Sequence, residues 1–198
     1  MFTGIIEVLG KVENIEKEGS NVHFTISSNI SSELKVDQSV SHSGVCLTVT
    51  ECDANLHKVT AIDETLKKTN LGALGIGHEV NLERCMISNG RFDGHVVQGH
   101  VDKTAKVTGI KEEEGSWIFD FSFGASEEVV VDKGSICING VSLTCFDTTE
   151  DSFRVAIIPY TYEHTTFKHL KIGDEVNLEF DIIGKYVRRL LEKREASI

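Results

Sequence analysis

The stretch Gly44-Val45-Cys46-Leu47-Thr48 is repeated 96 residues later as Gly140-Val141-Ser142-Leu143-Thr144. The run Ile76–Glu83 recurs at the same offset as Ile172–Glu179, with one substitution. Near the start, Gly4 corresponds to Gly99 at an offset of 95. Matches that keep one order and nearly one offset indicate tandem duplication, and this period is the size of a small domain. The sequence therefore predicts two homologous domains.

The composition argues against several classes of protein. The 198 residues carry a formal net charge of −11, which disfavours nucleic acid or an anionic membrane as a partner. No run approaches the ~18 apolar residues of a membrane-spanning helix, and the first residues lack the pattern of a secretion signal. The five cysteines are odd in number and form no Cys-x-x-Cys pair, which is typical of reduced thiols in a cytoplasmic protein.

Short segments in which apolar and polar residues alternate recur through both halves, with glycine between them. This pattern is typical of small antiparallel β-barrels. A single helical turn is expected over 64–69, and a polar linker over 86–94. We expect domains at 1–88 and 95–181. The expected strands are 2–12, 22–27, 34–40 leading into 45–50, 57–62 and 80–83, then 96–107, 117–123, 135–138, 141–145, 153–158 and 176–180.

The tail, residues 182–198, is expected to be helical. Ile183, Val187, Leu190 and Leu191 are spaced so that they share one face of a helix. Two interpretations are equally compatible with this pattern. The apolar face packs against copies of itself in an oligomer, or it caps the barrel of its own chain.

The two copies differ at positions that carry reactive side chains, while their glycine, leucine and threonine positions are retained. This predicts two similar pockets for one kind of ligand, with unequal chemical roles. Paired by the repeat offset, the differing positions are Cys46 and Ser142, Ile5 and His100, and Cys85 and Asp181.

Several candidate residues also have a simpler structural interpretation. A cysteine on a strand is by default a small buried apolar residue. His42 is four residues before Cys46, roughly 13 Å along an extended chain, so no local Cys–His dyad is implied. His95 and His100 would point to opposite faces of a strand, which disfavours a shared metal site. Asp181 could be a surface carboxylate or the N-cap of the tail helix.

The combined motifs resemble the riboflavin synthase family of lumazine-binding double-barrel proteins. The resemblance covers essentially the whole chain. It rests on Met1–Glu7, the repeated Gly-Val-x-Leu-Thr stretches, Glu64-Thr65, Gly94-His95 with Gly99-His100-Val101-Asp102, and Asn177–Asp181 with Lys185-Tyr186. Beside the expected pockets, Gln98, Lys103 and Ser43 depart from residues common in the family.

The resemblance implies two six-stranded Greek-key barrels and a C-terminal helix through which three chains associate. It implies that two molecules of 6,7-dimethyl-8-ribityllumazine exchange a four-carbon unit, giving riboflavin and 5-amino-6-(D-ribitylamino)uracil, with no cofactor or metal. Lumazine synthase is a candidate partner. A non-catalytic lumazine- or flavin-binding relative is the alternative, but it would not need Phe2, Cys46, His100, Ser142 and Asp181 together.

The family's site residues transfer to two pockets, one in each barrel, and Phe2 is expected to close over the bound rings. The N-terminal pocket would use Gly4, Ile5, Ile6, Ser39, Cys46, Leu47, Thr48, Thr60, Ala61, Ile62, Asp63, Glu64 and Thr65. The C-terminal pocket would use Gly99, His100, Val101, Lys133, Val141, Ser142, Leu143, Thr144, Val155, Ala156, Ile157, Ile158, Pro159 and Tyr160.

The expected catalytic residues are His100, Cys46, Ser142, Asp181 and Ser39. In this hypothesis His100 transfers a proton, helped by Ser142 or Thr144, while Cys46 and Ser39 act on the second molecule. Asp181 would polarise the C-terminal pocket. The working site would lie between the N-terminal barrel of one chain and the C-terminal barrel of another.

Overall fold

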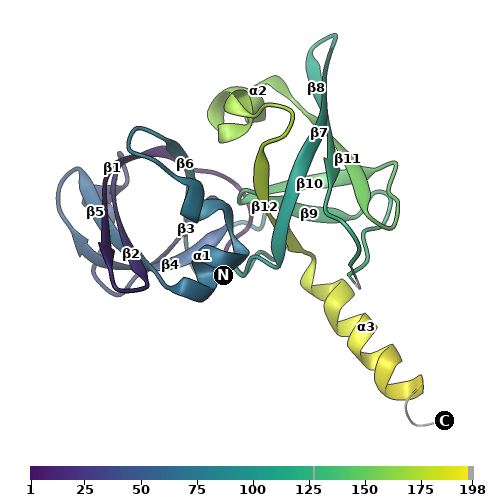
Figure 1. Ribbon diagram of the computed structural model, residues 1–198, viewed down its shortest axis with the longest axis horizontal. Coiled ribbons are helices and arrows are strands. Elements are labelled where there is room, and N and C mark those ends of the chain that lie inside the picture. The colour runs from purple at the N-terminus through teal and green to yellow at the C-terminus, as the bar shows by residue number, and fades with distance from the viewer. Residues whose placement is uncertain (127, 196–198) are drawn as a thin grey trace.

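The two halves of the chain form two closed six-stranded antiparallel barrels in the computed structural model, which describes residues 1–126 and 128–195 (Figure 1). The first barrel has the neighbour order β1-β2-β5-β4-β3-β6, and the second repeats it as β7-β8-β11-β10-β9-β12. The predicted all-β architecture of two tandem barrels is confirmed. The strands are β1 (Val8–Glu18), β2 (Asn21–Ser27), β3 (Ser39–His42), β4 (Val45–Cys52), β5 (Leu56–Ala61), β6 (Glu79–Arg84), β7 (Lys103–Glu113), β8 (Ser116–Ser122), β9 (Ser135–Ile138), β10 (Val141–Phe146), β11 (Ser152–Ile157) and β12 (Glu175–Phe180).

A short helix follows the fifth strand of each barrel. The helical turn predicted over 64–69 is α1 (Asp63–Lys68), and its counterpart α2 (Pro159–His164) begins at a proline, which suits the first turn of a helix. Short 3-10 turns complete the connections at η1 (Ser31–Glu33), η2 (Asn70–Ala73) and η3 (Thr166–His169).

The opening segments of the two repeats, residues 2–7 and 97–102, do not extend the first strands as predicted. β1 begins at Val8 and β7 at Lys103. Gly4 and Gly99 interrupt the extended backbone, because their φ angles of 79° and 78° lie in the left-handed region. The segments cross the junction between the barrels instead, where Phe2 and Val97 form an antiparallel bridge.

Two buried asparagines fasten the barrels together at equivalent positions. Each donates its side-chain N–H to a carbonyl of the opposite barrel and accepts a backbone N–H from that barrel. A buried amide needs such partners, because losing its bonds to water is costly. Asn81 donates to Asn139 O (2.8 Å) and accepts from Thr166 N (2.8 Å), and Asn177 donates to Ser43 O (2.8 Å) and accepts from Asn70 N (2.7 Å).

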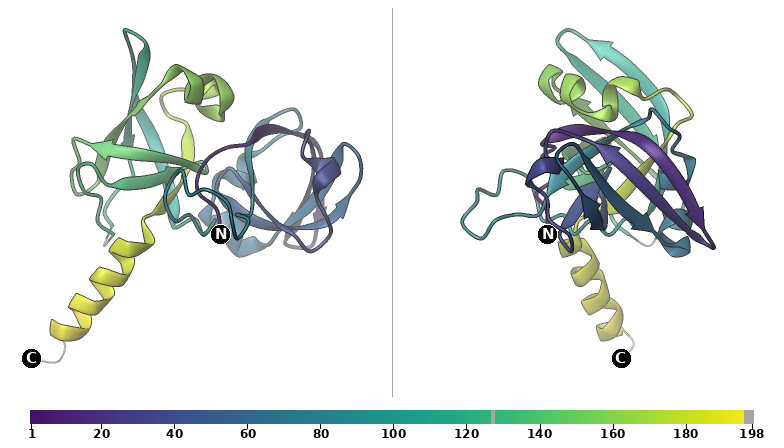
Figure 2. Two further views of the ribbon diagram at one scale, coloured as in Figure 1. Left: turned by 180° about the vertical axis from the view of Figure 1, so that it is seen from behind. Right: turned by 90° about the vertical axis from the view of Figure 1, so that its left-hand side faces the viewer.

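The first turns of α3 (Ile182–Glu195) are tied to the C-terminal barrel by charged side chains. Lys185 Nζ lies 2.6 Å from Asp102 Oδ2, and Arg188 lies 3.0 Å from Glu128 Oε1. Beyond these contacts the helix projects away from both barrels (Figure 2). In the described part of the chain, no helix has the length and apolar character that crossing a membrane requires.

The predicted apolar stripe of α3 faces solvent. Ile183, Val187, Leu190 and Leu191 are each more than half exposed. The interpretation that this stripe caps the helix's own barrel is therefore wrong, because the contacts to that barrel are made by charged residues on another face. Residues 196–198 of the predicted helix lie outside the described residues.

The two barrel cores are filled differently. The C-terminal core gathers phenylalanine rings, with Phe119 edge-on to Phe167 at 5.2 Å between ring centroids. The N-terminal core is mainly aliphatic but encloses His42 and His57.

The two histidines form one buried hydrogen-bonded chain. Their Nε2 atoms lie 2.9 Å apart, His57 Nδ1 is 2.9 Å from the Ser31 hydroxyl, and His42 Nδ1 is 3.1 Å from the Val40 carbonyl. Burial lowers the pKa of His57 from 6.5 to about 4. Burial, followed by the neighbouring His57, lowers the pKa of His42 from 6.5 to about 3. His42 is thus engaged inside the barrel rather than with Cys46, in agreement with the spacing argument.

These depressed pKa values predict a loss of stability in mild acid. In the unfolded chain the two histidines bind protons below about pH 6.5, whereas in the folded chain they bind them only near pH 4 or lower. The free energy of unfolding therefore falls as the pH drops through this window. The expected slope is roughly 1.4 kcal/mol per pH unit for each proton bound only by the unfolded chain. Urea unfolding between pH 7 and 5 measures it.

The double variant His42→Ile/His57→Phe, which copies the equivalent residues Ile138 and Phe153 of the other barrel, should flatten this dependence. His78→Asn, at an exposed turn, should leave it unchanged. An equal slope in the wild type and the double variant would contradict the assignment.

Candidate functional site

Each barrel has one place where two neighbouring strands stop pairing. In the N-terminal barrel the ladder between β4 and β5 runs from Cys52 only as far as the Val49–Val59 pair. Closer to the start of β4, the N–H of Cys46 donates to the carbonyl of Gly99 at 2.9 Å. The backbone between Cys46 and Val49 therefore faces β5 across an opening, which we call the N-terminal open edge.

The C-terminal barrel repeats this construction. The ladder between β10 and β11 covers Cys145–Val155 and Phe146–Arg154, and the N–H of Ser142 donates to the carbonyl of Gly4 at 2.7 Å. The stretch of β10 from Ser142 to Cys145 forms the C-terminal open edge. Amide groups at an interrupted ladder can bind a flat ligand whose donors and acceptors imitate a strand.

A buried glutamate holds each opening segment in place. Glu83 on β6 accepts the N–H of Thr3 at 2.7 Å and that of Gly4 at 2.9 Å. Glu179 on β12 accepts the N–H groups of Gln98, Gly99 and His100 at 2.7 to 2.9 Å. Burial raises the pKa of both carboxyls, and these backbone hydrogen bonds oppose that rise.

The opening segments are exchanged between the barrels, which corrects the predicted composition of the pockets. Gly4 and Ile6 were expected in the N-terminal pocket, but Gly4 bonds to Ser142 and Ile6 packs on the C-terminal core. Gly99 and Val101 were expected in the C-terminal pocket, but Gly99 bonds to Cys46 and Val101 packs on the N-terminal core. The sequence offset shows which residues correspond but does not show which barrel each segment contacts.

The N-terminal open edge brings Cys46, Ser39 and the segment of His100 together. Burial raises the pKa of the Cys46 thiol, and a hydrogen bond from Ser39 opposes this shift, so the group favours the neutral thiol. His100 is exposed and follows Gly99, whose carbonyl holds the Cys46 N–H. Within one chain His100 therefore lies on the side of Cys46 and not of Ser142, so its predicted joint role with Ser142 stays a prediction that needs a second chain.

The C-terminal open edge contains a histidine, His95, that is not among the predicted site residues. His95 Nδ1 lies 2.7 Å from the Ser142 hydroxyl. Burial lowers the pKa of His95, and the nearby carboxylate of Asp181 opposes this shift. Asp181 also accepts the N–H of Ile183 at 3.0 Å, so the predicted N-cap is confirmed. The only signal for His95 was its place in the Gly94-His95 motif, because its contact with Ser142 spans 47 residues.

Phe2 lies at the junction of the barrels and not over either open edge. Its side chain is fully buried and packs with Val97 and Cys137, beside Cys46. The predicted role of Phe2 as a lid over bound rings is therefore wrong in this structure, because the ring is part of the core.

The remaining predicted residues lie on the strands and turns that bound the open edges. Thr48 and Thr144 are exposed on β4 and β10. Lys133 is exposed in the turn before β9, and its N–H donates to Cys145 at the far end of β10. Two predicted sets lie across the openings, each from the end of the fifth strand of a barrel to the start of the helix that follows. At the end of β5 and the start of α1 they are Thr60, Ala61, Ile62, Asp63, Glu64 and Thr65. At the end of β11 and the start of α2 they are Val155, Ala156, Ile157, Ile158, Pro159 and Tyr160. Leu47 and Val141 are buried, and Leu143 is half-buried.

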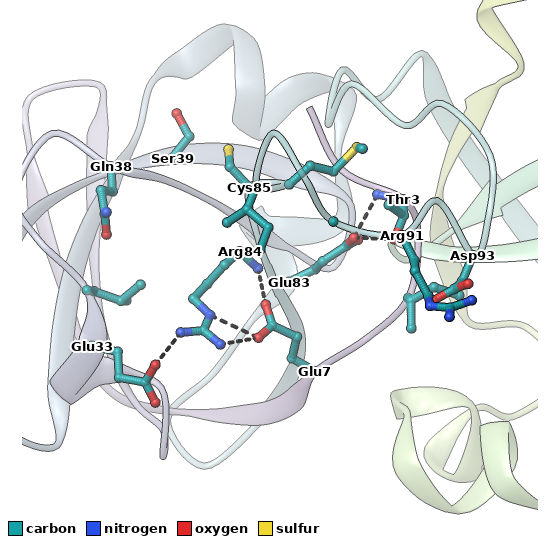
Figure 3. A pocket seen from close by; sticks show the side chains of 15 residues that line it. Thr3, Glu7, Glu33, Gln38, Ser39, Glu83, Arg84, Cys85, Arg91 and Asp93 are labelled. Atoms are coloured by element: carbon teal, nitrogen blue, oxygen red, sulfur yellow. Dashed lines mark hydrogen bonds and ion pairs between the residues drawn. The ribbon is translucent and has the colours of Figure 1, made fainter.

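A cavity of about 530 Å³ adjoins the N-terminal segment. Figure 3 shows Ser39 and Cys85 at one side of it and the Glu83 carboxylate beneath Thr3. Ile5 also lines this cavity, as Ser39 does, although its neighbour Gly4 contacts Ser142. The Arg84 guanidinium, bound by two carboxylates, lies at the opposite side of the cavity. The ion pairs are Arg84–Glu7 and Arg84–Glu33, both at 2.6 Å.

The close approach of Gly99 to Cys46 predicts a specific cost for Gly99→Ala. An added Cβ would lie 2.6 Å from Cys46 Cβ and 2.9 Å from the Phe2 ring. We expect the free energy of unfolding to fall by roughly 2–4 kcal/mol, about half from the left-handed backbone and the rest from overlap. Gly19→Ala is the matched control, because Gly19 has φ 60° but open space around it, so only the backbone cost of about 1–2 kcal/mol remains. If urea unfolding shows the same loss of unfolding free energy in Gly99→Ala and Gly19→Ala, the close packing of Gly99 against Cys46 is contradicted.

Comparison with known proteins finds the same duplication of one domain. The lumazine binding domain matches twice, at residues 3–85 and 98–181. The chain is 45% identical to riboflavin synthase of Bacillus subtilis over 195 residues, covering 98% of this chain and 91% of that protein. It is 38% identical to riboflavin synthase of Saccharomyces cerevisiae over 203 residues, covering 96% of this chain and 85% of that protein.

Among solved structures, LumP complexed with 6,7-dimethyl-8-(1'-D-ribityl) lumazine superposes with a TM-score of 0.83 at 23% identity, covering 91% of this chain and 99% of LumP. This likeness supports the double-barrel fold. The two family matches span both barrels, and the similarity to the bacterial and yeast enzymes extends over nearly the full length. The chain therefore belongs to the lumazine-binding family of riboflavin synthases.

Proposed function

We propose that the chain converts two molecules of 6,7-dimethyl-8-ribityllumazine into riboflavin and 5-amino-6-(D-ribitylamino)uracil. The observation that carries this proposal is the pair of equivalent open edges, one in each barrel. Two like sites suit two copies of one substrate, and holding both in position supplies much of the rate. The atoms of two substrates equal those of the two products, so the four-carbon transfer balances without an external oxidant.

The pyrimidinedione ring would bind along each open edge. Its alternating N–H and C=O groups resemble those of an extended peptide, so it can take the place of the missing strand partner beside Thr48 in one barrel and Thr144 in the other. The outward side chains of these threonines would then contact the ligand. The opening segments that contain Gly4 and Gly99 close the ends of the two open edges.

The reaction requires loss of a proton from the C7 methyl group of one lumazine and addition of a nucleophile at C7 of the other. His100 is exposed and suited to take that proton. Cys46, kept as a neutral thiol, and Ser39 would carry protons or orient a hydroxyl at the lumazine of the N-terminal barrel. Ser142, bonded to His95 near Asp181, would act on the lumazine of the C-terminal barrel.

We further propose that the working site lies between chains of a homotrimer assembled through α3. The exposed stripe on α3 supports this, because isolated apolar stripes of this kind are stabilised by burial against a partner. His100 on the N-terminal barrel of one chain would then face Ser142 and Thr144 of a neighbour. This arrangement restores between chains the grouping that a single chain lacks.

Cytoplasmic location and association with lumazine synthase complete the proposal. The five cysteines are all unpaired, which supports a reducing compartment. The resemblance of the chain to its family supports lumazine synthase as a partner.

The first test is incubation of the pure protein with 6,7-dimethyl-8-ribityllumazine alone, followed by absorbance and fluorescence. We expect one riboflavin for every two lumazine molecules consumed. Binding with a spectral shift but no riboflavin would identify a lumazine carrier and reject the enzymatic function.

In the same assay His100→Ala and Cys46→Ala are each expected to lower kcat by roughly 10²–10⁴, the usual contribution of a positioned proton-transfer group. His78→Ala and Cys52→Ala are matched controls away from the open edges and should stay within about twofold of the wild type. Unchanged turnover in His100→Ala or Cys46→Ala would reject the role given to that residue.

Leu190→Asp should dissociate the trimer, because burying an unpaired carboxylate in an apolar helix interface is costly. We expect a monomer by light scattering coupled to size-exclusion chromatography, and loss of turnover at concentrations where the wild type is a trimer. Arg189→Asp, on the same helix but outside the stripe, should retain both properties. A trimeric Leu190→Asp variant, or a fully active monomer, would contradict assembly through α3.

A further inference from the structure

A hydrogen-bonded relay lies on the outer face of the N-terminal barrel, between two strands that are adjacent in Figure 1. His23 on β2 is paired in register with Thr60 on β5. His23 Nδ1 lies 2.8 Å from the Thr60 hydroxyl, and His23 Nε2 lies 3.1 Å from Glu18 Oε2. A carboxylate, an imidazole and a hydroxyl are thus connected in series.

This relay ends at the N-terminal open edge. The β4–β5 ladder stops at the Val49–Val59 pair, so Thr60 is the first residue of β5 beyond it. Thr60, His23 and Thr50 also line one cavity of about 550 Å³. Thr60 therefore borders the open edge on its β5 side.

When the His23 ring is neutral, the relay determines which way the Thr60 hydroxyl points. The Glu18 carboxylate only accepts, so His23 Nε2 must carry the proton of that hydrogen bond. In the neutral ring Nδ1 is then an acceptor, and the hydroxyl of Thr60 donates to it. The free lone pairs of Thr60 oxygen remain available to accept a hydrogen bond, whereas a threonine without this partner could turn either way.

The C-terminal barrel lacks the relay at the same place. The pair in register there is Ile118 on β8 and Ala156 on β11, which offers neither imidazole nor hydroxyl. The difference adds to the divergence between Cys46 and Ser142. It indicates that the two open edges bind the same kind of ligand with unequal hydrogen bonding.

We propose that His23 is a positioning residue, which fixes the Thr60 hydroxyl as an acceptor for an N–H or O–H group of the ligand in the N-terminal open edge. A ring N–H or a ribityl hydroxyl is the matching donor. His23 acts through Thr60 and makes the N-terminal site bind more tightly than it otherwise would, while the C-terminal site is unaffected. This inference rests on the proposed function, which supplies the ligand.

The experiment titrates the full-length protein with riboflavin, a probe that is not consumed, and follows its fluorescence to resolve the two classes of site. His23→Phe and Thr60→Val should each weaken one class about 3–10-fold, the value of one hydrogen bond, and leave the other class unchanged. The double variant should be no weaker than either single variant, because both remove the same interaction.

Two further variants separate positioning from a general structural effect. His23→Asn retains a polar atom where Nδ1 stood, so it should restore at least half of the lost affinity on a logarithmic scale. Thr50→Val is the matched control, because its hydroxyl bonds to the Lys58 carbonyl and not to His23. In the double variant Thr50→Val/His23→Phe, the changes in the free energy of riboflavin binding caused by the two substitutions should add.

Additive losses in His23→Phe/Thr60→Val, equal weakening of both classes, or unchanged affinity would each overturn the inference. Turnover of 6,7-dimethyl-8-ribityllumazine by the wild type is measured in parallel. If the wild type does not turn over, the proposed reaction fails, while the riboflavin titration still decides the role of His23.

Discussion

The exchange of the two opening segments is the constraint on which both sites depend. Each barrel leaves a stretch of strand unpaired, and the segment that ends this opening comes from the other repeat. Glu83 and Glu179 make the exchange stable, because each buried carboxylate is satisfied by backbone N–H groups of the segment it holds. Without these bonds the carboxylates would be buried and unpaired, so the segments and the barrels fold as one unit.

The same junction makes the two sites rigid with respect to each other. Asn81 and Asn177 bond across it in equivalent ways, and the signature glycines meet there, since a Cβ on Gly44 would lie 2.7 Å from the backbone nitrogen of Gly140. Their left-handed backbone and this close approach both require glycine. The glycines of the repeated signature therefore position the open edges and need not contact a ligand.

The duplicated scaffold carries different chemistry in its two halves. The N-terminal edge has a neutral thiol, a serine and an exposed histidine, whereas the C-terminal edge has a serine bonded to the buried His95 close to Asp181. The relay from Glu18 through His23 to Thr60 exists only in the first barrel, among the residues the structure describes. Two identical substrates that must play opposite parts in one reaction need this kind of asymmetry.

The sequence by itself determined the duplication, the strand pattern, the apolar stripe of the tail helix and the positions where the two copies differ. Each of these depends on local spacing or on an offset that can be read along the chain. Which barrel receives Gly4 or Gly99 depends on backbone bonds to Ser142 and Cys46, far away in sequence, and no periodicity records it. The pairing of His95 with Ser142, the burial of Phe2 and the grouping of His100 with Cys46 were decided only by the tertiary structure, because residues more than 40 positions apart in the sequence meet there in the folded chain.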